Sequence, residues 1–130
     1  MKILGIDFGT KRVGLAISDE TAQFARELAI WTPEQFWTEI QSLIDSETIE
    51  VIVVGLPLNM SGEDSEKTGE ARAFAERLKQ TVHVPIELVD ERLTSQMAEQ
   101  IAGTSKNIDS LAAQIFLQTY LDNHKSHEPV

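Results

Sequence analysis

Near the start of the chain, in residues 2–8, apolar side chains occupy both the even-numbered and the odd-numbered positions. This pattern is typical of a central strand that is buried on both faces. A second strand is predicted over residues 13–18, after a tight connection at residues 9–12. A third, weaker strand is expected between Gln23 and Trp31. The chain therefore opens with three predicted strands, which are partly antiparallel.

Helical spacing of apolar residues begins after Thr32, which is followed by Pro33 and Glu34. A hydroxyl N-cap, a proline and an acid in the first turn are usual at the start of a helix. Residues 50–55 contain a β-branched run that predicts a buried strand. The later predicted elements are a helix over residues 65–80, a short strand over 85–90, and helices over 94–102 and 108–123.

The order of these elements predicts an α/β fold, in which a mixed sheet carries helices on both faces. The 130 residues suit a single domain, expected over residues 1–123, with a frayed tail over 124–130. Ligands of such sheets sit beyond the carboxyl ends of the parallel strands. We therefore expect the functional site at that edge.

Composition narrows the function classes. The chain has no cysteine, which excludes disulfides, zinc–thiolate sites and thiol catalysis. No apolar run approaches the ~20 residues of a membrane-spanning helix, and the opening residues 1–7 carry a charge too early to serve as the apolar region of a signal peptide. We therefore expect a cytoplasmic protein without a membrane partner. The formal charge of -10 predicts weak non-specific binding to nucleic acid, although bound divalent cations and a local basic rim can supply a positive field.

Three carboxylates are the candidates for chemistry. Asp7 interrupts an apolar strand, Glu91 directly follows the short strand, and Asp109 opens the last helix. Each has a structural alternative: a turn for Asp7, an ion pair or helix cap for Glu91, and an N-cap for Asp109. Together they predict hard oxygen ligands for one or two Mg²⁺ or Mn²⁺ ions. Two such ions would activate water and stabilise the leaving oxygen of a phosphodiester.

Basic and small polar residues near these acids are candidates for holding the substrate backbone. The basic ones are Lys11, Arg12, Arg92 and Lys106. Charge balance on a solvated rim explains them equally well. Asn59 and Ser61 could approach a phosphate closely, although a turn that leads into a helix uses similar residues.

Six segments resemble, in order, the motifs of the bacterial YqgF/RuvX family, and together they cover nearly the whole chain. They are IDFGTKRVG (6–14), VGLPLNMSG (54–62), FAERL (74–78), DERLTS (90–95), IDSLAA (108–113) and LQTYL (117–121). The resemblance implies an RNase H-like fold related to Holliday junction resolvases. It also implies a nuclease that processes the 5′ end of precursor 16S rRNA in ribosome biogenesis.

The same resemblance carries the family's acidic residues onto Asp7, Glu91 and Asp109. Compared with the resolvase pattern, the strand at residues 51–55 lacks an acid, and Glu91 on the next strand substitutes for it. A second departure lies before Asp109, in a segment that is shorter and less basic than is usual in the family. Between Glu99 and Asp109, Lys106 is the one basic residue. This low positive charge argues against a mobile loop that grips the substrate.

Several other functions remain open from the sequence. A junction resolvase acting on branched DNA would need a homodimer, because resolution takes two symmetric cuts. A monomer suits a nuclease of precursor rRNA, with pre-ribosomal particles as partners. The acidic charge also fits a ribosome-assembly or nucleic-acid-binding factor with a vestigial site. An ATPase fragment, suggested by the resemblance of residues 7–11 to a phosphate loop, would need a second lobe that 130 residues cannot supply.

Overall fold

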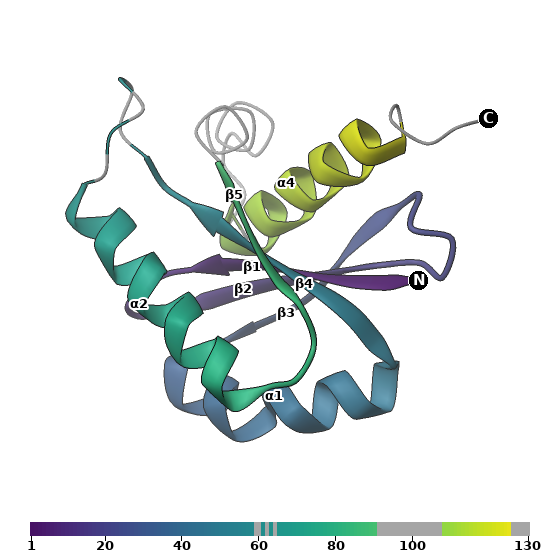
Figure 1. Ribbon diagram of the computed structural model, residues 1–130, viewed down its shortest axis with the longest axis horizontal. Coiled ribbons are helices and arrows are strands. Elements are labelled where there is room, and N and C mark those ends of the chain that lie inside the picture. The colour runs from purple at the N-terminus through teal and green to yellow at the C-terminus, as the bar shows by residue number, and fades with distance from the viewer. Residues whose placement is uncertain (59–60, 62, 64, 91–107, 126–130) are drawn as a thin grey trace.

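The computed structural model describes residues 1–58, 61, 63, 65–90 and 108–125, with the backbone alone for residues 108–111, 124 and 125. The chain forms a five-stranded sheet with helices on both of its faces (Figure 1). The strand order is β3-β2-β1-β4-β5. The strands are β1 (Lys2–Phe8), β2 (Val13–Ser18), β3 (Ala25–Trp31), β4 (Ile49–Leu56) and β5 (Ile86–Asp90).

Strand β1 lies at the centre of the sheet because apolar residues cover both of its faces. It pairs antiparallel with β2 and parallel with β4, and β4 pairs parallel with β5. The ends of these three parallel strands, at Phe8, Leu56 and Asp90, therefore share one edge, which we call the carboxyl edge. The opposite side, where Lys2 begins β1, is called the amino edge.

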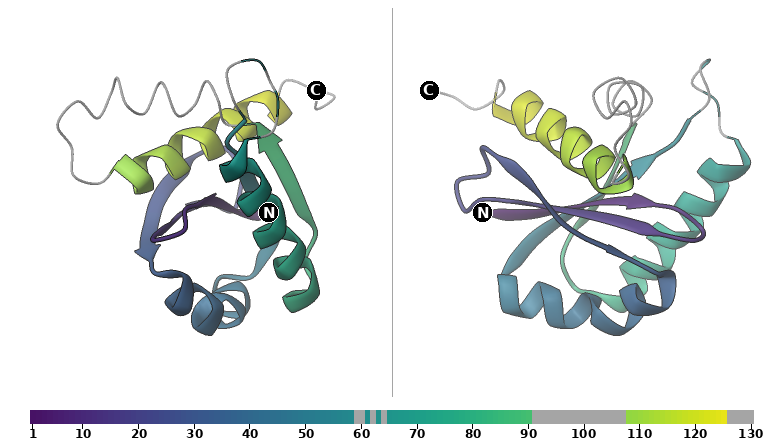
Figure 2. Two further views of the ribbon diagram at one scale, coloured as in Figure 1. Left: turned by 90° about the vertical axis from the view of Figure 1, so that its left-hand side faces the viewer. Right: turned by 180° about the vertical axis from the view of Figure 1, so that it is seen from behind.

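Of the helices in the described part of the chain, two cover one face of the sheet and one covers the other, as can be followed in Figure 2. Helices α1 (Pro33–Glu47) and α2 (Glu66–Thr81) pack on the face that includes Leu4 and Ile6. Helix α4 (Ile108–Lys125) packs on the face that includes Ile3. Both α1 and α2 begin with a capping box, at Thr32 and Ser65 respectively, which satisfies amide groups that the helix itself leaves without acceptors.

The structure confirms the predicted mixed α/β fold, and helix α1 begins after Thr32 as expected. The seven other described elements begin and end within two residues of their predicted bounds. Helix α4 continues to Lys125, two residues past the expected domain boundary at residue 123. The predicted helix over 94–102 and the tail beyond Lys125 lie outside the described residues. No helix in the described part of the chain has the length and apolar character needed to cross a bilayer.

Helix α4 runs from the carboxyl edge toward the amino edge. Its Gln118 binds the backbone of Gln23 and Ala25, beside the connection between β2 and β3. That connection lies at the amino edge, where the Met1 amine donates to the Glu20 carbonyl. The first turns of α4 consequently lie toward the end of β1, as Figure 1 shows.

Candidate active site at the carboxyl edge

Asp7 is the second-to-last residue of β1 and lies at the carboxyl edge. Successive side chains of a strand point to opposite faces, so Asp7 shares its face with Ile3 and Gly5. This is the face that α4 covers, since Leu117 lies against Gly5. Asp7 is half-buried, whereas most residues before it in β1 are buried. The predicted position of Asp7 at the end of the central strand is thus confirmed.

Glycines flank Asp7 on both neighbouring strands. Gly14 of β2 is its registered partner. On β4, Val54 pairs with Ile6, so Gly55 is the next residue toward the carboxyl edge and shares the face of Val53. Cross-strand neighbours normally place Cβ atoms about 5 Å apart. Gly14 and Gly55 therefore place no side chain beside Asp7 on this face, which suits the approach of a metal ion or a phosphate.

The other two predicted ligands lie beyond the side chains that the structure describes. Asp109 lies in the first turn of α4, which the structure describes at the backbone level, and Glu91 lies outside the described residues. Asp90, the residue before Glu91, is the last residue of β5. Its side chain points to the same face of the sheet as Leu88, which is the face away from α4. Within the described ranges, no three His, Cys, Asp or Glu side chains are grouped as metal ligands. A carboxylate set remains compatible with Mg²⁺ or Mn²⁺ because both ions prefer hard oxygen donors.

The turn after β1 places two basic side chains at this edge. A Cβ on Gly9 would lie 2.7 Å from the carbonyl oxygen of Arg12, so this tight turn requires glycine. Lys11 and Arg12 are exposed in the turn. Both predicted basic residues therefore lie at the same edge as Asp7, where they can contact a bound anion without displacing core residues.

The segment after β4 is anchored to the start of α2. The buried Thr68 hydroxyl donates to the Pro57 carbonyl at 2.8 Å, and the Ser65 amide donates to the Thr68 hydroxyl at 3.0 Å. This anchoring holds the beginning of the connection, directly after β4, against the first turn of α2. Ser61 is exposed in that connection. The remaining predicted substrate-binding residues, Asn59, Arg92 and Lys106, lie outside the described residues.

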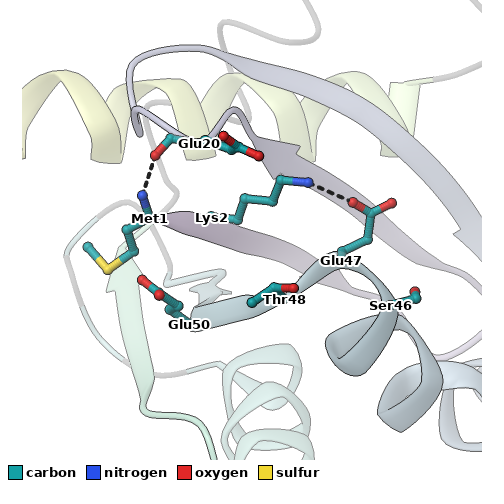
Figure 3. Close-up of a pocket in the computed structure, with 7 residues that line it drawn as sticks. All are labelled: Met1, Lys2, Glu20, Ser46, Glu47, Thr48 and Glu50. Carbon is teal, nitrogen blue, oxygen red and sulfur yellow. Dashed lines mark hydrogen bonds and ion pairs between the residues drawn. The ribbon is translucent and has the colours of Figure 1, made fainter.

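A polar pocket of about 600 Å³ lies at the amino edge, opposite the candidate site (Figure 3). Its lining includes the acids Glu20, Glu47 and Glu50 together with Lys2 and Met1. The Lys2 ammonium contacts Glu47 Oε2 at 2.9 Å, and its hydrogen bond and charge lower the pKa of the Glu47 carboxyl. No predicted site residue lines this pocket.

Comparison with known proteins agrees with the resemblance seen in the motifs. Residues 1–123 match the family model described as "RuvX: Holliday junction resolvase". A protein of Maridesulfovibrio salexigens named "Putative pre-16S rRNA nuclease" is 46% identical, over 93% of this chain and 98% of its own length. A protein of Dictyoglomus turgidum with the same name is 39% identical, over 95% of each chain.

Solved structures share the fold at low sequence identity. Thermus thermophilus RuvC in complex with a Holliday junction substrate superposes with a TM-score of 0.58 at 18% identity, over 100% of this chain and 99% of that one. A fowlpox virus resolvase in complex with Holliday junction DNA gives 0.54 at 12% identity, over 95% and 99%. The RuvC likeness supports the expected RNase H-like fold. On the match over residues 1–123 and the identity to these relatives, the chain belongs to the RuvX family.

Proposed function

We propose that this chain is a metal-dependent endonuclease that hydrolyses phosphodiester bonds at the 5′ end of precursor 16S rRNA, in the cytoplasm. The observation that carries the proposal is the half-buried Asp7 at the carboxyl edge, between Gly14 and Gly55. A carboxylate that is withdrawn from water in such a strand is costly unless a cation or hydrogen bonds compensate it. The names of the relatives supply the substrate, because they share 38–46% of their aligned residues with this chain.

Asp7, Glu91 and Asp109 are the proposed ligands and catalytic carboxylates. Asp7 ends β1, Glu91 follows β5, and Asp109 opens α4, so the three come from segments that meet the same edge. Asp90 faces away from α4, which favours its neighbour Glu91 as the acid of this segment. When bound, Mg²⁺ or Mn²⁺ would supply activation of water and stabilisation of the leaving oxygen.

The proposed substrate-binding residues surround these acids. Lys11 and Arg12 in the turn after β1 would hold phosphates of the RNA backbone, and Ser61 would donate a hydrogen bond. Asn59, Arg92 and Lys106 complete the proposed set. A local basic group is needed because the chain has a net charge of -10, which repels RNA elsewhere on the surface.

A second candidate function is resolution of Holliday junctions. The description of the matched family and the RuvC fold favour it. It requires a homodimer with two sites facing one junction, whereas rRNA processing is compatible with a monomer that acts on pre-ribosomal particles. The two functions differ in substrate and oligomeric state but share the same proposed carboxylates.

The first experiment compares the wild type with Asp7→Asn on labelled precursor 16S rRNA and on a four-way DNA junction. Each reaction is run with Mg²⁺, with Mn²⁺ and with EDTA. Asp45→Asn is the matched control, because Asp45 is exposed on α1 and its replacement removes the same charge. We expect metal-dependent cleavage of the rRNA by the wild type and the control, and none by Asp7→Asn.

The other outcomes would each change the proposed function or its catalytic residues. Cleavage of the junction alone, with a dimer in solution, would replace rRNA processing by junction resolution. Cleavage that persists in Asp7→Asn would remove Asp7 from the catalytic set. No cleavage of either substrate by a folded wild type, together with binding of RNA, would favour the factor with a vestigial site.

A further inference from the structure

A buried tyrosine links α4 to the edge strand β5. The Tyr120 hydroxyl donates to Glu87 Oε2 at 2.6 Å, and the Tyr120 side chain is 7% exposed. Glu87 belongs to the same cross-strand row as Gly5, because Gly5 pairs with Val53 and Val53 pairs with Glu87. In that row, Leu117 of α4 contacts the central strand β1 at Gly5. Tyr120 of the same helix reaches the outer strand β5 at Glu87.

Polar contacts hold α4 on its other side as well. Gln118 accepts from the Ala25 amide and donates to the Gln23 carbonyl, both at 2.8 Å. Gln114 donates to the Ala25 carbonyl at 3.3 Å. Helix α4 packs mainly over β1, β2 and β3. The Tyr120–Glu87 hydrogen bond thus connects α4 to the side of the sheet formed by the parallel strands β4 and β5. On that side the helix has less packing that could fix its tilt.

We propose that Tyr120 and Glu87 are positioning residues for the carboxylate site. Their hydrogen bond fixes the tilt of α4 against β4 and β5, and thereby the place of the first turn of α4, which carries Asp109, relative to Asp7. A helix is stiff, so a change of tilt at Tyr120 moves its start, about 16 Å away along the axis. The inference rests on the proposed function, since it assigns these residues to the same metal site.

The test measures Mn²⁺ binding by the electron paramagnetic resonance signal of free Mn²⁺, alongside the Mg²⁺ concentration that gives half-maximal cleavage. Tyr120→Phe removes the hydroxyl and keeps the ring in the core. We expect it to raise the Mn²⁺ dissociation constant and the Mg²⁺ requirement roughly 2- to 30-fold. Excess Mg²⁺ should restore most of the activity. Glu87→Ala should reproduce this shift, and Glu87→Gln, which keeps an acceptor oxygen, should bind Mn²⁺ nearly as the wild type does.

Lys2→Met is the matched control. It removes another inter-element hydrogen bond, that of Lys2 to Glu47 at 2.9 Å, at the amino edge and away from the carboxylates. Its Mn²⁺ affinity should equal that of the wild type. An equal shift in Lys2→Met, or wild-type Mn²⁺ affinity in a folded Tyr120→Phe, would overturn the positioning role.

The failure of the proposed function gives a different result. In that case the wild type itself would not bind Mn²⁺, or Asp7→Asn would bind it with unchanged affinity, and both proposals would fall. Because wild type and Asp7→Asn are measured in the same series, the two failures are distinguished. A Tyr120→Phe/Glu87→Ala double variant that is no worse than either single variant would further support one shared hydrogen bond.

Discussion

Leu117 of α4 lies so close to Gly5 of β1 that a Cβ atom on Gly5 would be 3.0 Å from the Leu117 Cβ. The absence of a side chain at Gly5 lets the helix approach the central strand directly. The same contact fixes the distance of α4 from the face of β1 that Gly5 shares with Asp7. Packing at Gly5 therefore matters both for stability and for the proposed site.

Replacement of Gly5 by alanine tests this close approach. Because the added methyl group must displace Leu117, we expect Gly5→Ala to destabilise the fold by about 1–3 kcal/mol in urea unfolding. Gly69→Ala is the matched control, since Gly69 lies within α2 and a Cβ there would meet nothing within 4 Å. Alanine should stabilise that helix by about 0.5–1 kcal/mol. Equal effects at both positions would contradict close packing at Gly5.

The turn after β1 should contribute to RNA affinity through charge. In an Asp7→Asn background, which prevents cleavage, Lys11→Ala and Arg12→Ala should each weaken RNA binding. Each should also reduce the slope of log affinity against log salt by about 0.7–0.9, because each removes one phosphate contact. Both residues are exposed, so stability should change by less than about 0.5 kcal/mol.

Lys79→Ala provides the comparison for this prediction. Lys79 is an exposed cation in the last turn of α2, away from the carboxyl edge, where it pairs with Glu76 at 3.7 Å. Its replacement should leave the salt slope unchanged. If Lys79→Ala lowered the slope as much as Lys11→Ala, RNA would be attracted by the overall charge rather than by the turn.

Thr68 is expected to matter more for stability than other threonines of α2. Its hydroxyl is fully buried, donates to the Pro57 carbonyl and accepts from the Ser65 amide. Thr68→Val removes both bonds and should cost about 1–3 kcal/mol in urea unfolding. Thr81→Val, which loses an exposed bond to the Arg77 carbonyl, should cost less than about 0.5 kcal/mol. Similar costs for the two variants would refute the anchoring of the β4 connection by Thr68.

Asp19 gives a stability effect that depends on pH. The Thr21 hydroxyl and the amides of Gln23 and Phe24 lower the pKa of the Asp19 carboxyl from 3.8 to about 2. Because the folded pKa is below the unfolded value, this stabilisation is complete above about pH 4 and is lost as the pH falls toward 2. The melting temperature of Asp19→Asn should therefore lie below that of the wild type at pH 6, and the difference should shrink by pH 2. A difference that does not vary with pH would rule out this linkage.

Much of the site's location could be predicted from local pattern. The apolar strand ending at Asp7, the tight turn before Lys11 and Arg12, and the parallel order of the later strands all indicated the carboxyl edge, where the structure has Asp7 and both basic residues. Local pattern does not predict that glycines lie beside Asp7, because Gly14 and Gly55 become its neighbours only through the strand register. The signal that the sequence does offer is their position in segments 6–14 and 54–62, which resemble the family's motifs.

Sequence by itself determined the secondary elements of this protein, because side-chain periodicity, N-caps such as Thr32 and Ser65, and glycine turns act between residues a few positions apart. Tertiary structure decided which of these elements meet. Tyr120 binds Glu87 across 33 positions and Gln118 binds Ala25 across 93, and no periodic pattern encodes such pairs. The approach of α4 to the sheet, on which the proposed arrangement of carboxylates depends, follows from strand register and from the small volume of Gly5, both of which act only once the chain has folded.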